Sequence, residues 1–359
     1  MSTLNKPGRR PALIAGGRFD LNGSGCAVIF RAPMFPLYAY VLAFTAALVA
    51  TFTAMPLWRA WCLRSGLVDD PGHRKIHVEP VPLAGGFAVF TGLVLPILGV
   101  VAAANMGWLG GTAASPLEHG FEKRALQLAA IFAGALGMVL LGWLDDKHEL
   151  RARTKFAGQF AIGALVAAAG VRITLFVPSV VFSYAVTILW IVTLANAMNF
   201  LDNMNGLCGG LGAIASASLG GIAAMHGQYL VALLAFLVCG ALLGFLPFNY
   251  PRARVFIGDS GAHLVGYLLA VLAILPHFYS ADSPRPLAVL SPLLVLAVPL
   301  GDLVCVVWIR ARAGKPFWIG DTNHISHRLV RRGFSKEKAV AVVWGLGAVG
   351  GLAAIALNS

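Results

Sequence analysis

The chain has 359 residues, of which 58% are hydrophobic and only 12% are charged, and its formal net charge at pH 7 is +12. With a mean hydropathy of +0.78, this composition excludes a soluble globular domain and predicts an all-α polytopic membrane protein. In that class, surplus Lys and Arg are typical of cytoplasmic loops and of contact with membrane lipids, so we expect no nucleic-acid partner. The five cysteines form no CxxC pair, which argues against a disulfide framework and a zinc site.

The N-terminal 34 residues are polar and basic and lack the apolar core of a signal peptide, so we expect a disordered tail over residues 1–34. Met34, directly before the first apolar segment, is an alternative start. Residues 35–359 are expected to form a single transmembrane domain. Hydropathy predicts about ten membrane-spanning helices in it, at roughly 36–57, 83–104, 125–144, 156–170, 181–201, 207–226, 228–247, 263–279, 287–309 and 338–357.

The distribution of Lys and Arg predicts the orientation of these helices. One set of alternate connections contains 18 basic residues and the opposite set contains 4. Because basic residues accumulate in cytoplasmic loops, the first set is assigned to the cytoplasm. The basic N-terminal tail argues mildly the other way, but long tails obey this rule poorly. The charged and Gly-rich stretches all lie on the predicted cytoplasmic side, at helix ends and in loops.

The first of these stretches carries Arg74, Lys75 and His77 and is followed by Gly85-Gly86. Basic side chains can contact phosphate, and glycines at a helix start let backbone amides approach an anion. The alternative is an ordinary basic loop followed by a closely packed glycine pair. Taken alone, these residues favour that alternative.

A pair of adjacent carboxylates, Asp145-Asp146, follows the third apolar segment. Two like charges so close together raise the pKa of one group, which suits a general base, unless a cation or a metal neutralises them. The alternative is a pair of interfacial acids that bind Lys147, Arg151 and Arg153. Since acids contribute little to topology, we favour a functional role.

Asn196, Asn199 and Asp202 follow at intervals of three at the end of the fifth segment, so they share one helix face and can point at one ligand. Amide and carboxylate oxygens suit Mg²⁺, which prefers oxygen ligands. The alternative is a polar helix end with caps and a turn, which Asn205-Gly206 begins.

Asp259 lies in the sequence Gly258-Asp259-Ser260-Gly261, just before the eighth segment. An Asp flanked by glycines at a helix start can offer its carboxylate to a metal while neighbouring amides bind phosphate. The same residues could instead cap the helix, because Asp and Ser are preferred at that position.

The last cytoplasmic loop brings together His324, Ser326, His327 and Arg328. Histidines beside arginines form a cationic surface suited to pyrophosphate or a nucleotide. A zinc site is the weaker alternative, since no cysteine lies near. Asp302 is an acid within the ninth segment and therefore either functional or paired with a buried partner such as Arg310.

Taken together and in order, these stretches resemble the polyprenyl-phosphate N-acetylhexosamine-1-phosphate transferase superfamily, over nearly all of residues 35–340. The resemblance implies a membrane fold of ten or eleven helices. It also implies Mg²⁺-dependent transfer of a sugar 1-phosphate from a UDP-N-acetylhexosamine to undecaprenyl or another polyprenyl phosphate, with release of UMP. Mn²⁺ is an expected substitute for Mg²⁺. The active site is expected to face the cytoplasm at the plasma membrane, and members are often homodimers.

The first loop looks like the branch that transfers N-acetylglucosamine 1-phosphate to start O-antigen, enterobacterial common antigen or teichoic acid linkage synthesis. Two alternatives stay open. One is the phospho-MurNAc-pentapeptide transferase of peptidoglycan synthesis, and the other is a non-catalytic protein that binds or transports polyprenyl phosphate. A secondary transporter is disfavoured because its charges would lie near mid-span.

The resemblance also assigns roles to residues. It implies metal binding by Asp259 and Asn199 and catalytic roles for Asp145, Asp146 and Asp202. It implies substrate binding by a set of polar and basic side chains, namely Lys75, His77, Asn196, His324, His327 and Arg328.

The chain departs from the family's pattern at a few positions. Ser326 stands where most bacterial members have His, and Asn203 stands where many have Gly. Asn205 replaces a usual Asp, as in the eukaryotic relatives. The serine at position 326 leaves the reaction class intact but puts the sugar-nucleotide contacts in doubt.

Overall fold

The computed structural model describes residues 37–69, 80–107, 114–174, 177–276, 278, 286–318 and 320–359, without the side chains of residues 114–123 and Pro286. The predicted N-terminal tail lies outside these residues, as does the stretch that carries Lys75 and His77.

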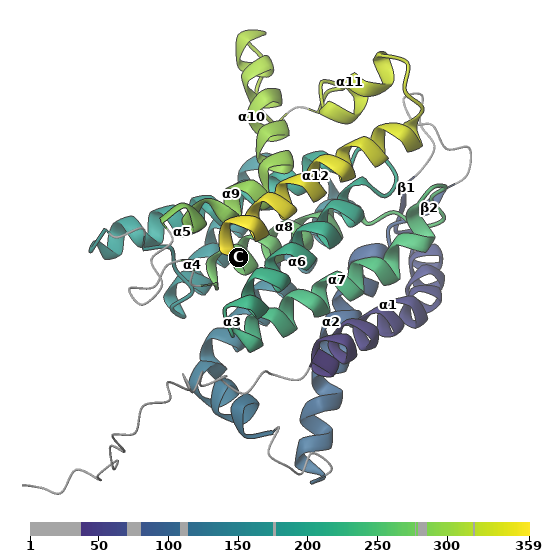
Figure 1. Ribbon diagram of the computed structural model, residues 1–359. Coiled ribbons are helices and arrows are strands. Elements are labelled where there is room, and N and C mark those ends of the chain that lie inside the picture. The colour runs from purple at the N-terminus through teal and green to yellow at the C-terminus, as the bar shows by residue number, and fades with distance from the viewer. Residues whose placement is uncertain are drawn as a thin grey trace, which may run out of the picture. The chain divides into compact units, whose positions relative to one another are not determined.

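The described residues form mainly α-helices joined by short connections (Figure 1). In chain order these are α1 Leu37–Ser65, α2 Gly85–Asn105, α3 Ala114–His148, α4 Ala152–Ala168, α5 Val180–Leu201, α6 Leu207–Met225, α7 Tyr229–Asn249, α8 Gly258–Ile274, α9 Ser291–Val295, α10 Ala297–Arg312, α11 Ile325–Arg331 and α12 Lys336–Asn358. A 3-10 helix, η1, covers Pro286–Leu290, and the short strands β1 Val68–Asp69 and β2 Val81–Pro82 pair antiparallel with Val68 opposite Pro82.

The ten predicted apolar segments all fall on these helices. Within the described residues, seven helices are long and apolar enough to cross a membrane, or eight when the pair Leu287–Val295 and Ala297–Arg312, bent by 67°, counts as one span. The apolar α8 is shorter, at 17 residues. The all-α polytopic class is therefore confirmed, whereas the number ten stays a prediction.

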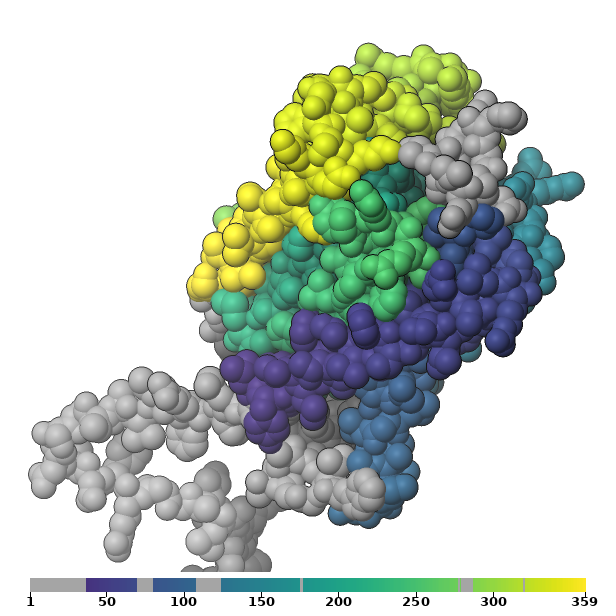
Figure 2. All heavy atoms as spheres, turned by 90° about the vertical axis from the view of Figure 1, so that its right-hand side faces the viewer, coloured from purple at the N-terminus to yellow at the C-terminus, as the bar shows by residue number. Residues whose placement is uncertain are grey.

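The helix α8 lies in the core. It is apolar around its whole circumference, with 15 buried residues, and it packs against α2, α3, α5 and α6. Small residues permit these close contacts: a Cβ added at Gly266 would lie 2.3 Å from the carbonyl oxygen of Leu194 on α5. Helices α1, α7 and α12 lie outside it and cover one face of the protein (Figure 2). The start of α8 is thus held by the elements that carry the predicted site.

Local sequence sets the ends of these elements. The hydroxyl oxygen of Ser179 accepts a hydrogen bond from the Phe182 amide at 3.3 Å and caps α5, and Ser335 caps α12 in the same way. At the other end of α5, the chain turns through Gly206, whose φ of +79° is accessible mainly to glycine. This turn leaves Asn199, Asp202, Asn203 and Asn205 at the boundary between α5 and α6.

Candidate active site

The site begins where the end of α3 meets the start of α8. The backbone amides of Asp259 and Ser260 donate hydrogen bonds to the two carboxylate oxygens of Asp146, at 2.9 and 3.1 Å. A carboxylate is favourable here because the first amides of a helix lack partners and carry partial positive charge. Gly258 has a φ of +68°, and a Cβ at this position would lie 2.8 Å from an Asp146 oxygen. Asp146 therefore fixes the start of α8 and the backbone of Asp259.

A lysine joins two of the carboxylates. The ammonium of Lys155, near the start of α4, contacts Asp145 and lies 3.1 Å from an oxygen of Asp259. Asp145 also accepts a hydrogen bond from the Leu150 amide at 2.9 Å. The side chain of Asp145 is buried, so the ammonium offsets charge that water cannot reach.

The end of α5 completes this cluster. The amide nitrogen of Asn199 donates a hydrogen bond to the second oxygen of Asp259, at 2.7 Å. Asp202 directly follows α5, and its pKa is raised to about 8 by burial and then by the charges of Asp259 and Asp146. This carboxyl group therefore keeps a proton near neutral pH until a cation offsets the neighbouring charges.

Asn196 lies one turn earlier on α5 and has different partners. Its amide nitrogen donates to the side-chain oxygen of Gln159 on α4 at 2.6 Å and to the Val192 carbonyl at 2.7 Å. The predicted shared face is thus divided: Asn199 contacts the carboxylate cluster, and Asn196 contacts α4. Its role in substrate binding stays a prediction.

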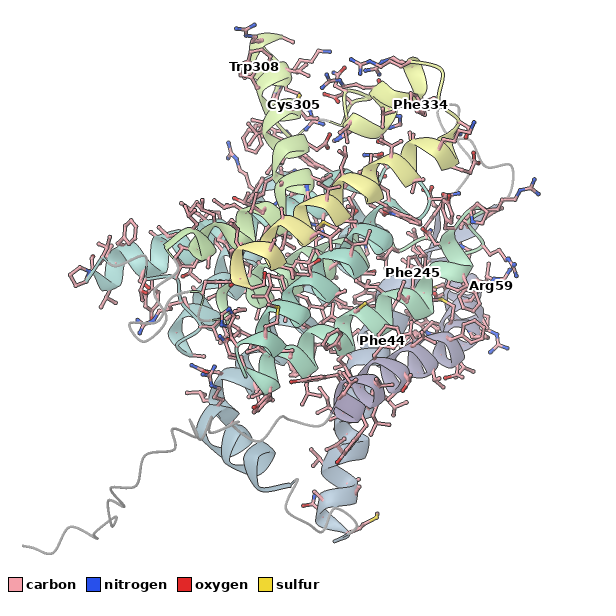
Figure 3. The ribbon with its side chains drawn as sticks, in the orientation of Figure 1. Phe44, Arg59, Phe245, Cys305, Trp308 and Phe334 are labelled. Atoms are coloured by element: carbon pink, nitrogen blue, oxygen red, sulfur yellow. The ribbon has the colours of Figure 1, made fainter. Side chains whose placement is uncertain are left out.

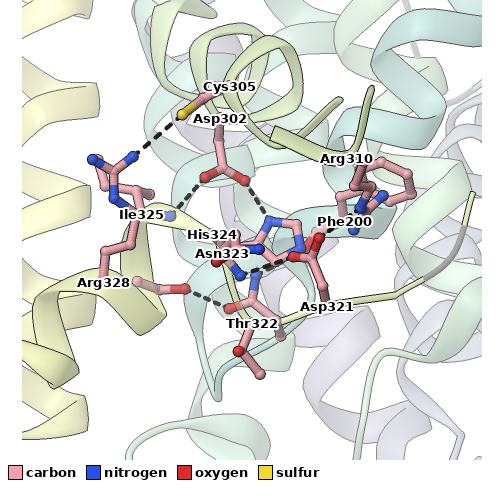
Figure 4. Close-up of polar contacts among 12 residues, drawn as sticks. Phe200, Asp302, Cys305, Arg310, Asp321, Thr322, Asn323, His324, Ile325 and Arg328 are labelled. Carbon is pink, nitrogen blue, oxygen red and sulfur yellow. Dashed lines mark hydrogen bonds and ion pairs between the residues drawn. The ribbon is translucent and has the colours of Figure 1, made fainter. Parts of the chain in front are cut away.

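The predicted histidine stretch meets the same end of α5. His324 is buried, its Nδ1 lies 2.6 Å from an oxygen of Asp302, and the other oxygen accepts from the Ile325 amide at 2.7 Å (Figure 4). The carboxylate selects the tautomer with a proton on Nδ1, which leaves Nε2 as an acceptor. The imidazole ring stands edge-on to Phe200, with 6.0 Å between ring centroids. Asp302 therefore orients His324.

The alternative interpretation of Asp302, a pairing with Arg310, is wrong. Arg310 lies two turns further along α10, where its Nε donates to Asp321 at 2.8 Å and its guanidinium covers the Phe200 ring at 4.8 Å. Asp302 is instead occupied by His324 and the Ile325 amide because the chain returns through residues 320–324 to the middle of α10.

His327 lies on the next turn, 6.3 Å from His324 between ring centroids. Burial, together with the positive charge of Arg331, lowers the pKa of His327, so this side chain is neutral at pH 7. The guanidinium of Arg328 contacts the sulfur of Cys305 at 3.2 Å, and its role in substrate binding stays a prediction (Figure 4).

Two of the three departures from the family's pattern, Ser326 and Asn203, touch each other. Ser326 is fully buried, and its hydroxyl donates a hydrogen bond to the side-chain oxygen of Asn203 at 2.6 Å. Asn203 in turn donates to the Phe200 carbonyl at 2.8 Å. This chain of bonds ties α11, which follows His324, to the turn that follows Asp202.

We expect these two positions to be coupled. Ser326→His alone should destabilise the protein by about 1–3 kcal/mol and lower turnover, because an imidazole overfills a buried site beside Asn203. Adding Asn203→Gly opens that space and should restore much of the lost stability and much of the lost turnover. Thermal unfolding and turnover of the two single variants and the double variant measure the coupling. Additive losses would show that the two side chains act independently.

The glycine pair after the first loop does not bind an anion with its amides. The Gly85 and Gly86 amides donate to the carbonyls of Phe256 and Ile257, both at 3.0 Å. A Cβ on Gly86 would lie 2.4 Å from the Gly261 amide nitrogen. The alternative of close packing is therefore correct: α2 abuts the start of α8. Lys75 and His77 lie outside the described residues, so their roles stay predictions.

The oxygen atoms of this site fit a hard cation. No group of three His, Cys, Asp or Glu side chains forms a complete metal site in the part of the chain that the structure describes. Mg²⁺ does not require one, since it usually binds one or two carboxylates together with substrate phosphates and water. An ammonium already lies against Asp145 and Asp259, where a positive charge is favourable. Asp259 and Asn199 therefore suit the predicted metal role.

Sequence reasoning missed the role of Lys155. Its signal is weak because every cytoplasmic loop is expected to contain lysines, and only the contact with Asp145 and Asp259 distinguishes this one. It also missed Gln159, which holds Asn196, and His263, whose Nδ1 lies 2.7 Å from the Asp259 carbonyl oxygen.

Comparison with known proteins yields one family. The model of Glycosyl transferase family 4 matches residues 128–277. A decaprenyl-phosphate N-acetylglucosaminephosphotransferase of Mycobacterium tuberculosis is 33% identical, over 96% of this chain and 88% of its own. A probable undecaprenyl-phosphate N-acetylglucosaminyl 1-phosphate transferase of Bacillus subtilis is 30% identical, over 89% of this chain and 85% of the relative. An Escherichia coli undecaprenyl-phosphate alpha-N-acetylglucosaminyl 1-phosphate transferase is 29% identical, over 77% of this chain and 73% of the relative.

The helices and the carboxylate cluster, with these similarities, define a polytopic membrane phosphoglycosyltransferase. The chain belongs to glycosyl transferase family 4. The predicted family is thereby confirmed, while the roles of single residues stay predictions.

Proposed function

We propose that this enzyme transfers N-acetylglucosamine 1-phosphate from UDP-N-acetylglucosamine to undecaprenyl or another polyprenyl phosphate and releases UMP. The observation that carries the proposal is the meeting of Asp146, Asn199 and Asp259, from three helix ends, with the ammonium of Lys155. Relatives that match most of this chain are named for N-acetylglucosamine and for an undecaprenyl or decaprenyl phosphate.

The reaction brings two anions together, the lipid phosphate and the diphosphate of the donor. Repulsion between them is the main electrostatic barrier, so positive charge has to lie between them. Bound Mg²⁺, or Mn²⁺ in its place, would supply Lewis-acid stabilisation of the diphosphate at Asp259 and Asn199. Lys155 holds a cationic group at the same place. His324 offers a nitrogen whose orientation Asp302 fixes, and His327 lies beside it.

The adjacent acids have different roles in this proposal. Both oxygens of Asp146 accept backbone amides of α8, so Asp146 positions Asp259. Asp145 holds the ammonium of Lys155 and is the better candidate for contact with the acceptor phosphate. Since a phosphate monoester has a second pKa near ~6, much of the acceptor is already dianionic at neutral pH. The acceptor therefore needs orientation more than a strong base.

The location follows from the charge distribution. Basic residues are concentrated in the connections on the side of the site, so we propose that the site faces the cytoplasm at the plasma membrane. We also propose that Lys75, His77 and Asn196 bind the substrates. The formation of a homodimer stays a prediction.

Release of UMP by purified protein in detergent tests the proposal. With undecaprenyl phosphate and Mg²⁺, we expect release from UDP-N-acetylglucosamine that depends on both the lipid and the metal and stops with EDTA. Parallel donors are UDP-N-acetylgalactosamine and UDP-MurNAc-pentapeptide. Release from the pentapeptide donor alone would move the enzyme to the peptidoglycan branch. No release from any donor by folded protein would favour a non-catalytic lipid-binding protein.

A further inference from the structure

A cleft of about 370 Å³ lies between α10, α11 and α12, and Asp302, which orients His324, forms part of its wall. Gly301 and Cys305 line it from α10, Leu329 from α11 and Leu346 from α12. Figure 3 shows Cys305 on α10, with Phe334 beyond α11 across from it. The cleft contains enough volume for part of a flexible apolar chain, and most of its walls are apolar.

The surroundings of the cleft face lipid. On α10, Val304 and Trp308 are 66% and 54% exposed, and on α12, Leu346 and Val349 are 46% and 64% exposed. Large apolar side chains that are exposed on membrane-spanning helices contact hydrocarbon. The occupant of the cleft therefore enters from the bilayer.

One end of the cleft is cationic. Arg328 lies on α11, Arg332 directly follows that helix, and both line the cleft. Asp302 also lines the cleft, but its two oxygens are already bonded to His324 and the Ile325 amide. No ion pair joins either guanidinium to an acid among the described residues, and the partner of Arg328 is the sulfur of Cys305. Guanidinium groups bind phosphate in a bidentate manner.

We propose that this cleft binds an anionic phospholipid, with the headgroup phosphate on Arg328 and Arg332 and an acyl chain along Leu329 and Leu346. A cationic end joined to an apolar groove at a lipid-facing surface is complementary to such an amphiphile. The acceptor polyprenyl phosphate shares this chemistry. The Asp302 carboxylate, however, lies between the cleft and His324, so a phosphate held by Arg328 is outside the carboxylate site.

The glycines of α10 and α12 offer a matched pair of variants. A Cβ added at Gly301 or at Gly345 meets no atom within 4 Å, so a side chain can start at either position without a clash. Gly301 lines the cleft and Gly345 does not. Gly301→Leu therefore fills the cleft, and Gly345→Leu adds the same side chain elsewhere on an exposed helix surface.

A second pair of variants tests the charge. Arg332→Ala removes a guanidinium from the cleft, and Lys336→Ala removes an exposed positive charge at the start of α12, outside the cleft. Full-length protein in detergent is titrated with dioleoyl phosphatidylglycerol, and native mass spectrometry gives the apparent Kd of the first lipid. Phosphatidylcholine and undecaprenyl phosphate are titrated in parallel.

We expect the unaltered protein, Gly345→Leu and Lys336→Ala to bind phosphatidylglycerol at least tenfold more tightly than Gly301→Leu and Arg332→Ala. The lipid should raise the unfolding temperature of the first group only, because it stabilises the folded state by binding to it. Equal affinity in Gly301→Leu and Gly345→Leu would overturn the proposal, as would equal affinity for phosphatidylcholine. Selective binding of undecaprenyl phosphate, lost in Gly301→Leu, would assign the cleft to the acceptor and overturn it too.

Discussion

Asp259→Asn should lower turnover by about a thousandfold or more, which corresponds to about 4 kcal/mol of transition-state stabilisation. The carboxylate accepts from Asn199 at 2.7 Å and lies 3.1 Å from the ammonium of Lys155. An amide removes the negative charge that both the ammonium and a divalent cation would contact. Release of UMP at saturating Mg²⁺ and substrates measures the loss.

The matched control for this substitution is Glu337→Gln, which makes the same carboxylate-to-amide change at an exposed position at the start of α12. It should leave turnover unchanged. The unfolding temperature of Asp259→Asn should stay close to that of the unaltered protein, since Lys155 keeps its contact with Asp145. Near-normal transfer by folded Asp259→Asn would contradict the assigned role.

Asp302→Asn is expected to have the second-largest effect, a fall in turnover of about a hundredfold. The two oxygens of Asp302 accept from His324 and from the Ile325 amide, and asparagine offers only one oxygen. The amide nitrogen that replaces the other oxygen favours the opposite tautomer of His324, as the loss of an orienting carboxylate does in other histidine sites. Turnover should fall more than the KM for the sugar nucleotide rises.

A double variant separates orientation of His324 from a general loss of structure. If Asp302 acts through His324, then Asp302→Asn combined with His324→Ala should be no slower than His324→Ala alone. Losses that multiply would instead indicate that Asp302 has a role of its own. The unfolding temperature of each variant identifies any that fail to fold.

The sequence predicts much of this site because acids and amides are rare at the ends of membrane helices. Asp145, Asp146, Asn199 and Asp259 could therefore be found from hydropathy and spacing, and the structure brings all four together. Lys155 could not be identified, since basic residues in cytoplasmic loops are expected for reasons of topology alone.

Other features depend on tertiary structure that periodicity does not encode. Asp302 and His324 meet because the chain folds back after α10, so the contact spans 22 residues of sequence. The short α11 has only 7 residues, too few for a hydropathy signal. Gly85 and Gly86, the first residues of α2, were open to two interpretations. Only their close approach to the start of α8 distinguishes packing from anion binding.

The bond between Ser326 and Asn203 has a consequence for how such enzymes diverge. The two positions are 123 residues apart in the chain, yet we expect a change at one to alter the effect of a change at the other. A lineage could exchange the serine at position 326 for histidine only after, or together with, a change to a smaller side chain at position 203. The two positions would then change together during evolution. A chimera that combines histidine at position 326 with Asn203 would have an overfilled, impaired site.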